Sequence, residues 1–141
     1  CNHPIKYNNT YLLYKKGWSG INIDIDEESI KQFNKIRTRD ENVQTLVTSF
    51  DGEEKDFYFY HDRSTINTIS KKLVDSRKNQ PKKIKKLKGK SLDSIIENSR
   101  FKDKHINLLS IDIENHEYEA LKNFNFDKYN VDIIVSEITD T

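Results

Sequence analysis

The sequence predicts an α/β fold in which mostly parallel strands alternate with helices. Runs rich in Ile and Val, with strand periodicity, alternate with runs whose apolar residues recur at helical spacing. Such alternation forms βαβ units, which build parallel sheets with right-handed crossovers and helices on both faces. The last strand-like run is nearly continuous in β-branched residues, which is typical of a buried parallel strand.

Length and composition indicate one domain that spans residues 1–141. Apolar residues make up only 34% of the chain, so the core depends on the aromatic side chains and the Ile, Leu and Val strands. A net charge of +1 gives no overall case for nucleic acid as a partner. One Cys excludes an intrachain disulfide framework, and no apolar run is long enough to span a membrane. We therefore expect a cytoplasmic protein with no membrane partner.

The first third of the chain is predicted to be loop, helix, strand and helix. Residues 1–9 contain a Pro and three Asn and should form a loop. A short helix over 10–16 then ends at a Gly. Residues 19–26 alternate Ile with Asn or Asp, which is the period of a strand. Residues 27–37 follow as an amphipathic helix with acids in its first turn.

The middle third is predicted to hold two strands and a weakly patterned basic segment. One strand covers 43–49, and a turn leads into the β-prone run 57–60, which should pair antiparallel. Between Lys71 and Lys90, ten basic residues accompany one acid. We interpret this Lys-rich segment as a solvated loop with an exposed strand over 83–88. Its alternative role is polyanion binding, although no aromatic residues are interleaved with the lysines.

The last third is predicted to be helix, strand, helix and strand. Ser91 caps a helix that continues to about residue 98. Within residues 106–121, an apolar run of strand length passes without Gly or Pro into a pattern with helical spacing, which predicts a strand that leads into a helix. Residues 131–138 should form a buried parallel strand. No strand precedes the first predicted helix, and the last strand falls at the end of the sequence. We therefore expect a sheet that lacks its first strand and its C-terminal strands.

The carboxyl end of the strand that begins near Ile106 carries four ionisable residues within six positions. They are Asp112, Glu114, His116 and Glu117. Because side chains alternate along a strand, Asp112 and Glu114 should leave the same face, at the edge where open α/β sheets bind ligands. The alternative is that Glu114 and Glu117 only complement the dipole of the following helix.

Asp24 ends an earlier predicted strand at the same kind of edge. An acid at that place can accept two hydrogen bonds from a ribose diol, so an adenosine-containing ligand is plausible. A dinucleotide-binding turn is not indicated, because the sequence contains no GxGxxG pattern.

Taken together, these segments resemble the FkbM family of S-adenosylmethionine-dependent methyltransferases. The most specific stretch is residues 108–117, which follows the family's Asp-Val-Glu-Gly-x-Glu pattern with Asn115 in place of Gly. Asn adopts left-handed backbone more readily than most residues, so the exchange is tolerable. The other stretches are Gly-Ile-Asn-Ile-Asp-Ile-Asp-Glu-Glu-Ser at 20–29, Ser-Leu-Asp-Ser-Ile-Ile at 91–96 and Ile-Ile-Val-Ser-Glu-Ile at 133–138. The resemblance covers most of the chain and implies a Rossmann-like class I methyltransferase fold.

The resemblance also implies a cofactor, an acceptor and the residues that bind the cofactor. The cofactor is S-adenosyl-L-methionine, and the acceptor is a hydroxyl group of a sugar, a glycan or another small molecule. The family's first glycine motif is matched only at its tail, by Cys1, Asn2 and His3. The predicted cofactor-binding residues are Cys1, Asn2, His3, Asp24, Ile25, Ser49 and Phe50.

Methyl transfer to a hydroxyl needs alignment and a base or a metal. We expect Asp112 and His116 to be the catalytic residues, although a lone His is more often structural. Glu114 and Glu137 should orient the reactants or share a divalent ion such as Mg²⁺ or Mn²⁺, which the sequence does not require. The alternative function is a non-catalytic remnant, or a polyanion-binding module that uses the Lys-rich segment and loses affinity steeply with salt.

Overall fold

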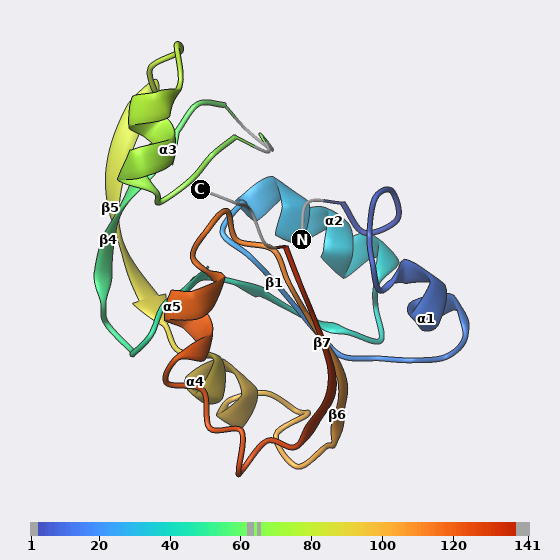
Figure 1. Cartoon of the computed structure of the whole chain (residues 1–141). Coiled ribbons are helices and arrows are strands. Elements are labelled where there is room, and N and C mark those ends of the chain that lie inside the picture. Colours follow the sequence, from blue (N-terminus) through green and yellow to red (C-terminus); the bar gives the residue numbers. More distant parts are fainter. Residues whose placement is uncertain (1–2, 62–63, 65, 138–141) are drawn as a thin grey trace.

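We describe the fold from a computed structural model of the chain. It describes residues 3–61, 64 and 66–137. Helices and strands alternate along most of this part of the chain (Figure 1). The elements are α1 (Tyr11–Lys15), β1 (Ile21–Asp24), α2 (Glu27–Ile36), β2 (Glu41–Gln44), β3 (Leu46–Val47), β4 (Glu54–Phe59), α3 (Lys71–Ser76), β5 (Lys83–Lys90), α4 (Leu92–Glu97), β6 (Ile106–Ile111), α5 (Glu117–Leu121) and β7 (Val131–Ser136).

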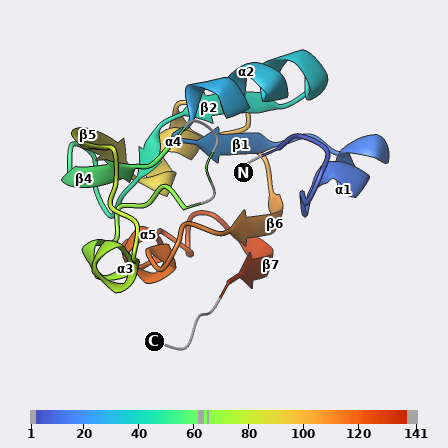
Figure 2. The same cartoon turned by 90° about the horizontal axis from the view of Figure 1, so that it is seen from above.

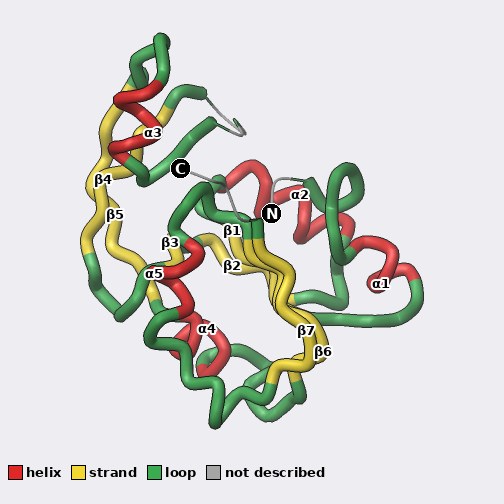
Figure 3. Tube along the Cα trace, viewed as in Figure 1, coloured by secondary structure: helices red, strands yellow, loops and turns green. Residues whose placement is uncertain are grey.

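The strands of the described residues form three small sheets (Figure 3). β1 and β2 pair in parallel, as do β6 and β7. In the third sheet, β5 lies between its parallel neighbour β3 and its antiparallel neighbour β4. The mixed α/β class and the mostly parallel pairing are as the sequence predicts. We expected one sheet, but the described strands form three separate ones, and β1 and β6 are not hydrogen-bonded neighbours.

The first βαβ unit, β1–α2–β2, follows its sequence pattern closely. The predicted strand over 19–26 is shorter than expected because Asp26 leaves it to cap α2, where its Oδ1 accepts a hydrogen bond of 2.7 Å from the Ser29 N–H. α2 buries Ile30 and Phe33 and packs against both strands. α1 and α2 each lie within one residue of their predicted bounds.

The predicted strand over 43–49 is wrong as one element. The chain forms β2 beside β1, changes sheet at Thr45, and forms β3 beside β5. A close approach fixes the second pairing, because a Cβ added at Gly89 of β5 would lie 2.2 Å from the Thr48 side chain. Only Gly fits there. The sheet change depends on this distant residue, so local periodicity could not indicate it.

The Lys-rich segment contains α3 and β5. The exposed strand predicted over 83–88 is confirmed, since β5 is exposed over most of its length. The sequence did not predict α3, which is capped by Ser70 and buries only Val74. Its apolar periodicity is too weak to stand out among lysines. The antiparallel strand predicted over 57–60 is confirmed as β4, which begins earlier, at Glu54.

Acidic residues of β4 lie opposite lysines of β5 across the sheet. Glu54 pairs with Lys88, and their side-chain charges lie 3.8 Å apart. Asp56 lies opposite Lys86. The Lys85 amine lies over the Phe59 ring, 5.5 Å from its centroid. Because side chains alternate between faces, these lysines do not gather into one basic face.

The larger core joins strands of all three sheets to α4 and α5. Leu92, Phe124 and Tyr129 are buried at its centre, and the Phe124 and Tyr129 rings stack with centroids 5.5 Å apart. The strand residues packed against this centre are Ile23, Val47, Ile106 and Val131. β1 and β6 therefore share a core although they do not share a sheet.

The prediction of a buried last strand is wrong. β7 is parallel, as expected, but Ile133, Ile134 and Val135 expose 57%, 43% and 44% of their surface. The reason is that β7 has only β6 as a neighbour among the described strands. Ile138, the last residue of the predicted strand, lies outside the described residues. No helix in the described part of the chain combines the length and apolar character of a membrane span.

Candidate functional site

Asp112 and Glu137 form a carboxyl pair at the ends of two neighbouring strands. Asp112 follows β6 and Glu137 follows β7, and the parallel register that sets Ile111 beside Ser136 makes them neighbours. The negative charge of Asp112, together with a hydrogen bond between the two side chains, raises the pKa of Glu137 above its ordinary value. A negative charge beside a carboxyl group disfavours its ionised form. Glu137 therefore keeps its proton to a higher pH than an ordinary glutamate.

The loop that follows Asp112 has an unusual backbone. Glu114 and Asn115 have positive φ angles of 56° and 71°. Residues other than Gly rarely adopt this region, and such residues cluster at functional sites. The pattern that residues 112–117 resemble has Gly at this position. Asn115 adopts the left-handed backbone that Gly favours and that Asn tolerates better than most residues. Glu117 helps to hold the loop, because its Oε1 accepts a hydrogen bond of 2.7 Å from the Ile113 N–H.

Glu114 joins the carboxyl pair in an acid cluster, which we define as Asp112, Glu114, Glu117 and Glu137. Burial raises the pKa of Glu114 above its ordinary value, and the charges of the other three residues raise it further. Arg77 opposes this shift, with its Nη2 4.0 Å from the Glu114 Oε2. Sequence reasoning missed Arg77 because it is one of many basic residues in the Lys-rich segment.

His116 has different neighbours. It stands at the N-cap of α5, and burial lowers the pKa of its imidazole, followed by the positive charge of Lys55 on β4. Its Nδ1 is buried without a hydrogen-bond partner among the described residues. The acids that act on it are Glu119 and Glu117. His116, at the start of α5, therefore favours its neutral form more than an ordinary histidine does.

Asp24 lies where the sequence predicted, at the carboxyl end of β1. It is partly buried, and its Oδ1 accepts a hydrogen bond of 2.8 Å from the Asp26 N–H. This bond fixes the carboxylate at the strand end. Ile25 follows, and its carbonyl accepts a bond of 3.4 Å from Gln44 Nε2.

The other predicted cofactor-binding residues differ in how exposed they are and in how many hydrogen bonds they already make within the protein. Ser49 is buried, and both its N–H and its hydroxyl donate to Glu53 Oε2, at 3.1 and 2.8 Å. The Phe50 ring is 58% exposed. The His3 Nδ1 accepts hydrogen bonds from the Ile5 and Lys6 amides, both at 3.0 Å, which closes a turn. Cys1 and Asn2 lie outside the described residues.

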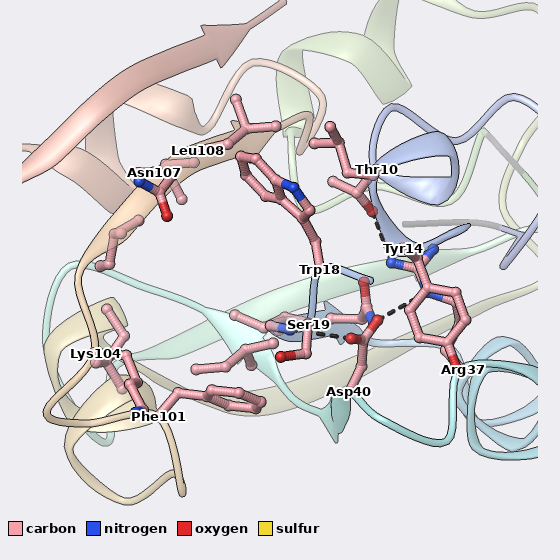
Figure 4. A pocket seen from close by; sticks show the side chains of 18 of the residues that line it. Thr10, Tyr14, Trp18, Ser19, Arg37, Asp40, Phe101, Lys104, Asn107 and Leu108 are labelled. Atoms are coloured by element: carbon pink, nitrogen blue, oxygen red, sulfur yellow. Dashed lines mark hydrogen bonds and ion pairs between the residues drawn. The ribbon is translucent and has the colours of Figure 1, made fainter. Parts of the chain in front are cut away.

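A cavity of about 200 Å³ lies elsewhere, between β1 and β6 (Figure 4). None of the predicted site residues that the structure describes lines it. Its walls include Ile21 of β1, Leu108 of β6, Trp18 and the buried ion pair of Arg37 and Asp40. Within the described residues, no three His, Cys, Asp or Glu side chains are grouped so that they could hold a metal ion.

Comparison with known proteins agrees with the resemblance seen in the sequence. The family model described as methyltransferase FkbM domain matches residues 2–141. No curated protein and no solved structure gives a significant match. Because the family match covers nearly the whole chain, this chain belongs to the FkbM methyltransferase family.

Proposed function

We propose that this methyltransferase domain uses S-adenosyl-L-methionine to methylate a hydroxyl group of a sugar or another small molecule. The observation that carries the proposal is the Asp112–Glu137 carboxyl pair, at the ends of two parallel strands and beside a loop with left-handed backbone. The units β1–α2–β2 and β6–α5–β7 are both parallel, which supports a Rossmann-like arrangement as part of the proposal.

Two residues described above fit the adenosyl part of this cofactor. The Asp24 carboxylate is held at the carboxyl end of β1, where an acid can accept hydrogen bonds from both ribose hydroxyls. The exposed Phe50 ring offers a face on which a purine can stack. Ser49 contributes less, because its hydroxyl and amide already bind Glu53. When bound, the cofactor supplies an electrophilic methyl group on a sulfonium.

The chain's own contribution to the reaction is to orient the acceptor and take its proton. A carboxylate of the Asp112–Glu137 pair can accept the proton of the acceptor hydroxyl as its oxygen becomes nucleophilic. The neighbouring carboxyl group favours this step, because uptake of a proton relieves the repulsion between the two negative charges. Glu114, held in the strained loop, orients the acceptor through hydrogen bonds to other hydroxyls.

His116 is the second candidate base. Its lowered pKa leaves the imidazole neutral and able to accept a proton, but its charged neighbours are Lys55, Glu119 and Glu117. The structure therefore favours the Asp112–Glu137 pair. The shared divalent ion stays a prediction, since no metal-binding group is formed by the described residues.

Polyanion binding by the Lys-rich segment is the alternative, and salt separates it from the proposal. Calorimetry on the protein as its gene encodes it should show S-adenosylhomocysteine binding that changes by less than about threefold between 50 and 500 mM salt, because hydrogen bonds hold the ligand. Transfer of labelled methyl groups to a panel of sugars then tests the acceptor class. If the protein binds heparin with a steep salt dependence and binds no adenosyl ligand, the methyltransferase proposal is wrong.

A further inference from the structure

The loop between β3 and β4, residues 48–53, carries an exposed aromatic ring directly after two buried residues. We call it the β3–β4 loop. Thr48 and Ser49 are buried, whereas the Phe50 ring that follows them is 58% exposed. Phe is among the residues that folded proteins bury most often. The loop therefore presents most of one aromatic ring to solvent while the residues before it are fixed in the fold.

Hydrogen bonds hold the backbone of the loop on both sides of Phe50. The Phe50 carbonyl accepts from the Thr48 hydroxyl at 3.0 Å and from the Glu53 N–H at 3.4 Å. The Gly52 N–H donates to the Gly89 carbonyl, and the Gly89 N–H donates to the Glu53 carbonyl, both at 2.9 Å. Gly89 belongs to β5, which lies beside β4 (Figure 2). The loop is therefore fastened to the sheet on which it lies.

The Glu53 side chain joins the two ends of the loop. Its Oε2 accepts hydrogen bonds from the Ser49 N–H and hydroxyl, and its Oε1 lies 2.6 Å from the Lys55 Nζ. The side chain is only 14% exposed. Burial alone would raise the pKa of Glu53, but the hydrogen bonds from Lys55 and Ser49 outweigh it and hold this pKa below its ordinary value. Glu53 is thus an ionised, mostly buried carboxylate, and such acceptors form strong hydrogen bonds.

The chain around the loop touches two elements of the candidate site. The Thr45 N–H, just before β3, donates a hydrogen bond of 2.9 Å to the Asp24 carbonyl at the end of β1. The Asn123 Nδ2, just after α5, donates one of 3.3 Å to the Ser49 carbonyl. Residues 45–49 therefore connect the strand end that carries Asp24 to the helix that follows the acid cluster.

We propose that Glu53 is a positioning residue of the cofactor site, which holds the β3–β4 loop so that the Phe50 ring can stack on the purine of an adenosyl ligand. The inference rests on the proposed function, which supplies that ligand. Glu53 does not touch the ligand and acts through Ser49 and the backbone of Phe50. A ring that is fixed before the ligand arrives loses little conformational freedom on binding, which raises the affinity. The donors of Ser49 serve to join Glu53 to the loop.

Calorimetry on the full-length protein, with S-adenosylhomocysteine and with adenosine, measures the effect. Glu53→Gln replaces a charged acceptor with a neutral amide and should weaken both ligands about tenfold. Glu54→Gln is the matched control on the next residue, since the Glu54 side chain is 54% exposed and lies 3.8 Å from Lys88. The control should change both affinities by less than about twofold. Equal losses in the two variants would overturn the proposal.

A double-mutant cycle with Phe50 separates positioning from a general loss of structure. Phe50→Ala should weaken S-adenosylhomocysteine about tenfold, because a stacked base loses its aromatic partner. Adding Glu53→Gln to this variant should then change the affinity by less than about twofold, since the ring that Glu53 positions is gone. Losses that multiply would mean that Glu53 acts independently of Phe50, which contradicts the proposal.

Proton NMR of bound adenosine gives a signature that a merely structural role of Glu53 would not change. Stacking on the Phe50 ring should shift the purine protons upfield, and Phe50→Ala should abolish this shift. At saturating ligand, Glu53→Gln should reduce the shift and Glu54→Gln should preserve it. A full upfield shift in Glu53→Gln would show that the ring does not need Glu53.

Ser49→Ala replaces Glu53→Gln in these tests if the latter does not fold. It removes the 2.8 Å bond to Glu53 without changing the charge and should weaken S-adenosylhomocysteine about threefold, but not in the Phe50→Ala background. Unchanged affinity in Ser49→Ala would overturn the proposal. If the wild type binds S-adenosylhomocysteine and Phe50→Ala binds it equally well, only this inference fails. If the wild type binds no adenosyl ligand, the proposed function fails as well.

Discussion

Two groups of polar side chains in this domain are built in opposite ways. The first is a buried network of Asn22, Arg37 and Asp40 at one wall of the cavity, where Arg37 and Asp40 expose only 3% and 6% of their surface. Asp40 accepts hydrogen bonds of 2.8 Å from both the Arg37 Nε and the Asn22 Nδ2. Its other oxygen accepts from the Gly20 N–H. Every charge in this network has its partner.

The acid cluster at the strand ends is the reverse. Of its four carboxyl groups, that of Glu114 lies 4.0 Å from the guanidinium of Arg77. The backbone is left-handed at two residues, and the pKa values of Glu114 and Glu137 are raised. Balanced buried charges with full hydrogen bonding are what structural networks require. Like charges held close together repel one another at neutral pH, so a functional role explains the cluster better than a structural one. The buried network should therefore control stability, and the acid cluster should control turnover.

Replacing Asp40 should have the largest effect on folding. Asp40→Ala leaves the buried Arg37 guanidinium without its carboxylate and should lower the free energy of unfolding by about 3–5 kcal/mol, measured by urea denaturation. Asp75→Ala is the matched control, since it breaks an ion pair with Lys71 whose side chains are 60% and 68% exposed. The control should cost less than about 0.5 kcal/mol. Similar losses in the two variants would contradict a structural role for the buried network.

Replacing Asp112 should lower turnover and leave the stability nearly unchanged. Asp112→Asn keeps the shape of an exposed side chain but removes the charge, so turnover should fall about 10²- to 10⁴-fold while the unfolding free energy changes by less than about 0.5 kcal/mol. Glu119→Gln, which removes a carboxylate of α5 outside the acid cluster, should keep most of the turnover. An Asp112→Asn protein that is unstable but fully active would make the acid cluster structural.

The sequence predicted local features of both groups but not their relationships. Amphipathic spacing and caps located α2 and α4 within about a residue, because helices depend on neighbours three and four positions away. The positions of Asp24 and Asp112 at strand ends followed from alternation and length. The buried network was not predicted, since Asp40 and Asn22 meet only after β1 and β2 have paired.

The errors have the same physical origin. The chain changes sheet at Thr45 because Gly89, far away in sequence, admits Thr48. The exposure of β7 depends on which strands lie beside it, and a β-branched run contains no such information. One charge that lowers the pKa of His116 belongs to Lys55 on β4, far away in sequence, so no local pattern could show it.

Replacing Asp24 should have a smaller effect, and this effect should be on ligand affinity rather than on stability. Asp24→Ala should weaken S-adenosylhomocysteine binding about ten- to a hundredfold, or about 1.5–3 kcal/mol, because a charged acceptor for the ribose is lost. Asp26→Ala is the control two residues away. It removes the cap of α2 and should cost about 1 kcal/mol of stability while leaving the affinity unchanged. Calorimetry and thermal unfolding measure the two effects, and the reverse result would place the ligand elsewhere.

The smallest effect is a dependence of stability on pH that comes from the acid cluster. Burial and the charge of Asp112 raise the pKa of Glu114, so the folded state favours its protonated form. This group therefore contributes stability below its unfolded pKa, near 4.5, and the contribution is lost as the pH rises through its folded pKa. Glu114→Gln should match the wild type near pH 4 and melt at a higher temperature than the wild type at pH 7.

The lowered pKa of His116 acts with the opposite sign in both proteins, so it cancels in the difference between them. Glu54→Gln, outside the acid cluster, should show no difference in melting temperature from the wild type that grows between pH 4 and pH 7. A Glu114→Gln protein that is less stable than the wild type at pH 7 would mean that the Arg77 contact outweighs the repulsion, and that the acid cluster is balanced after all.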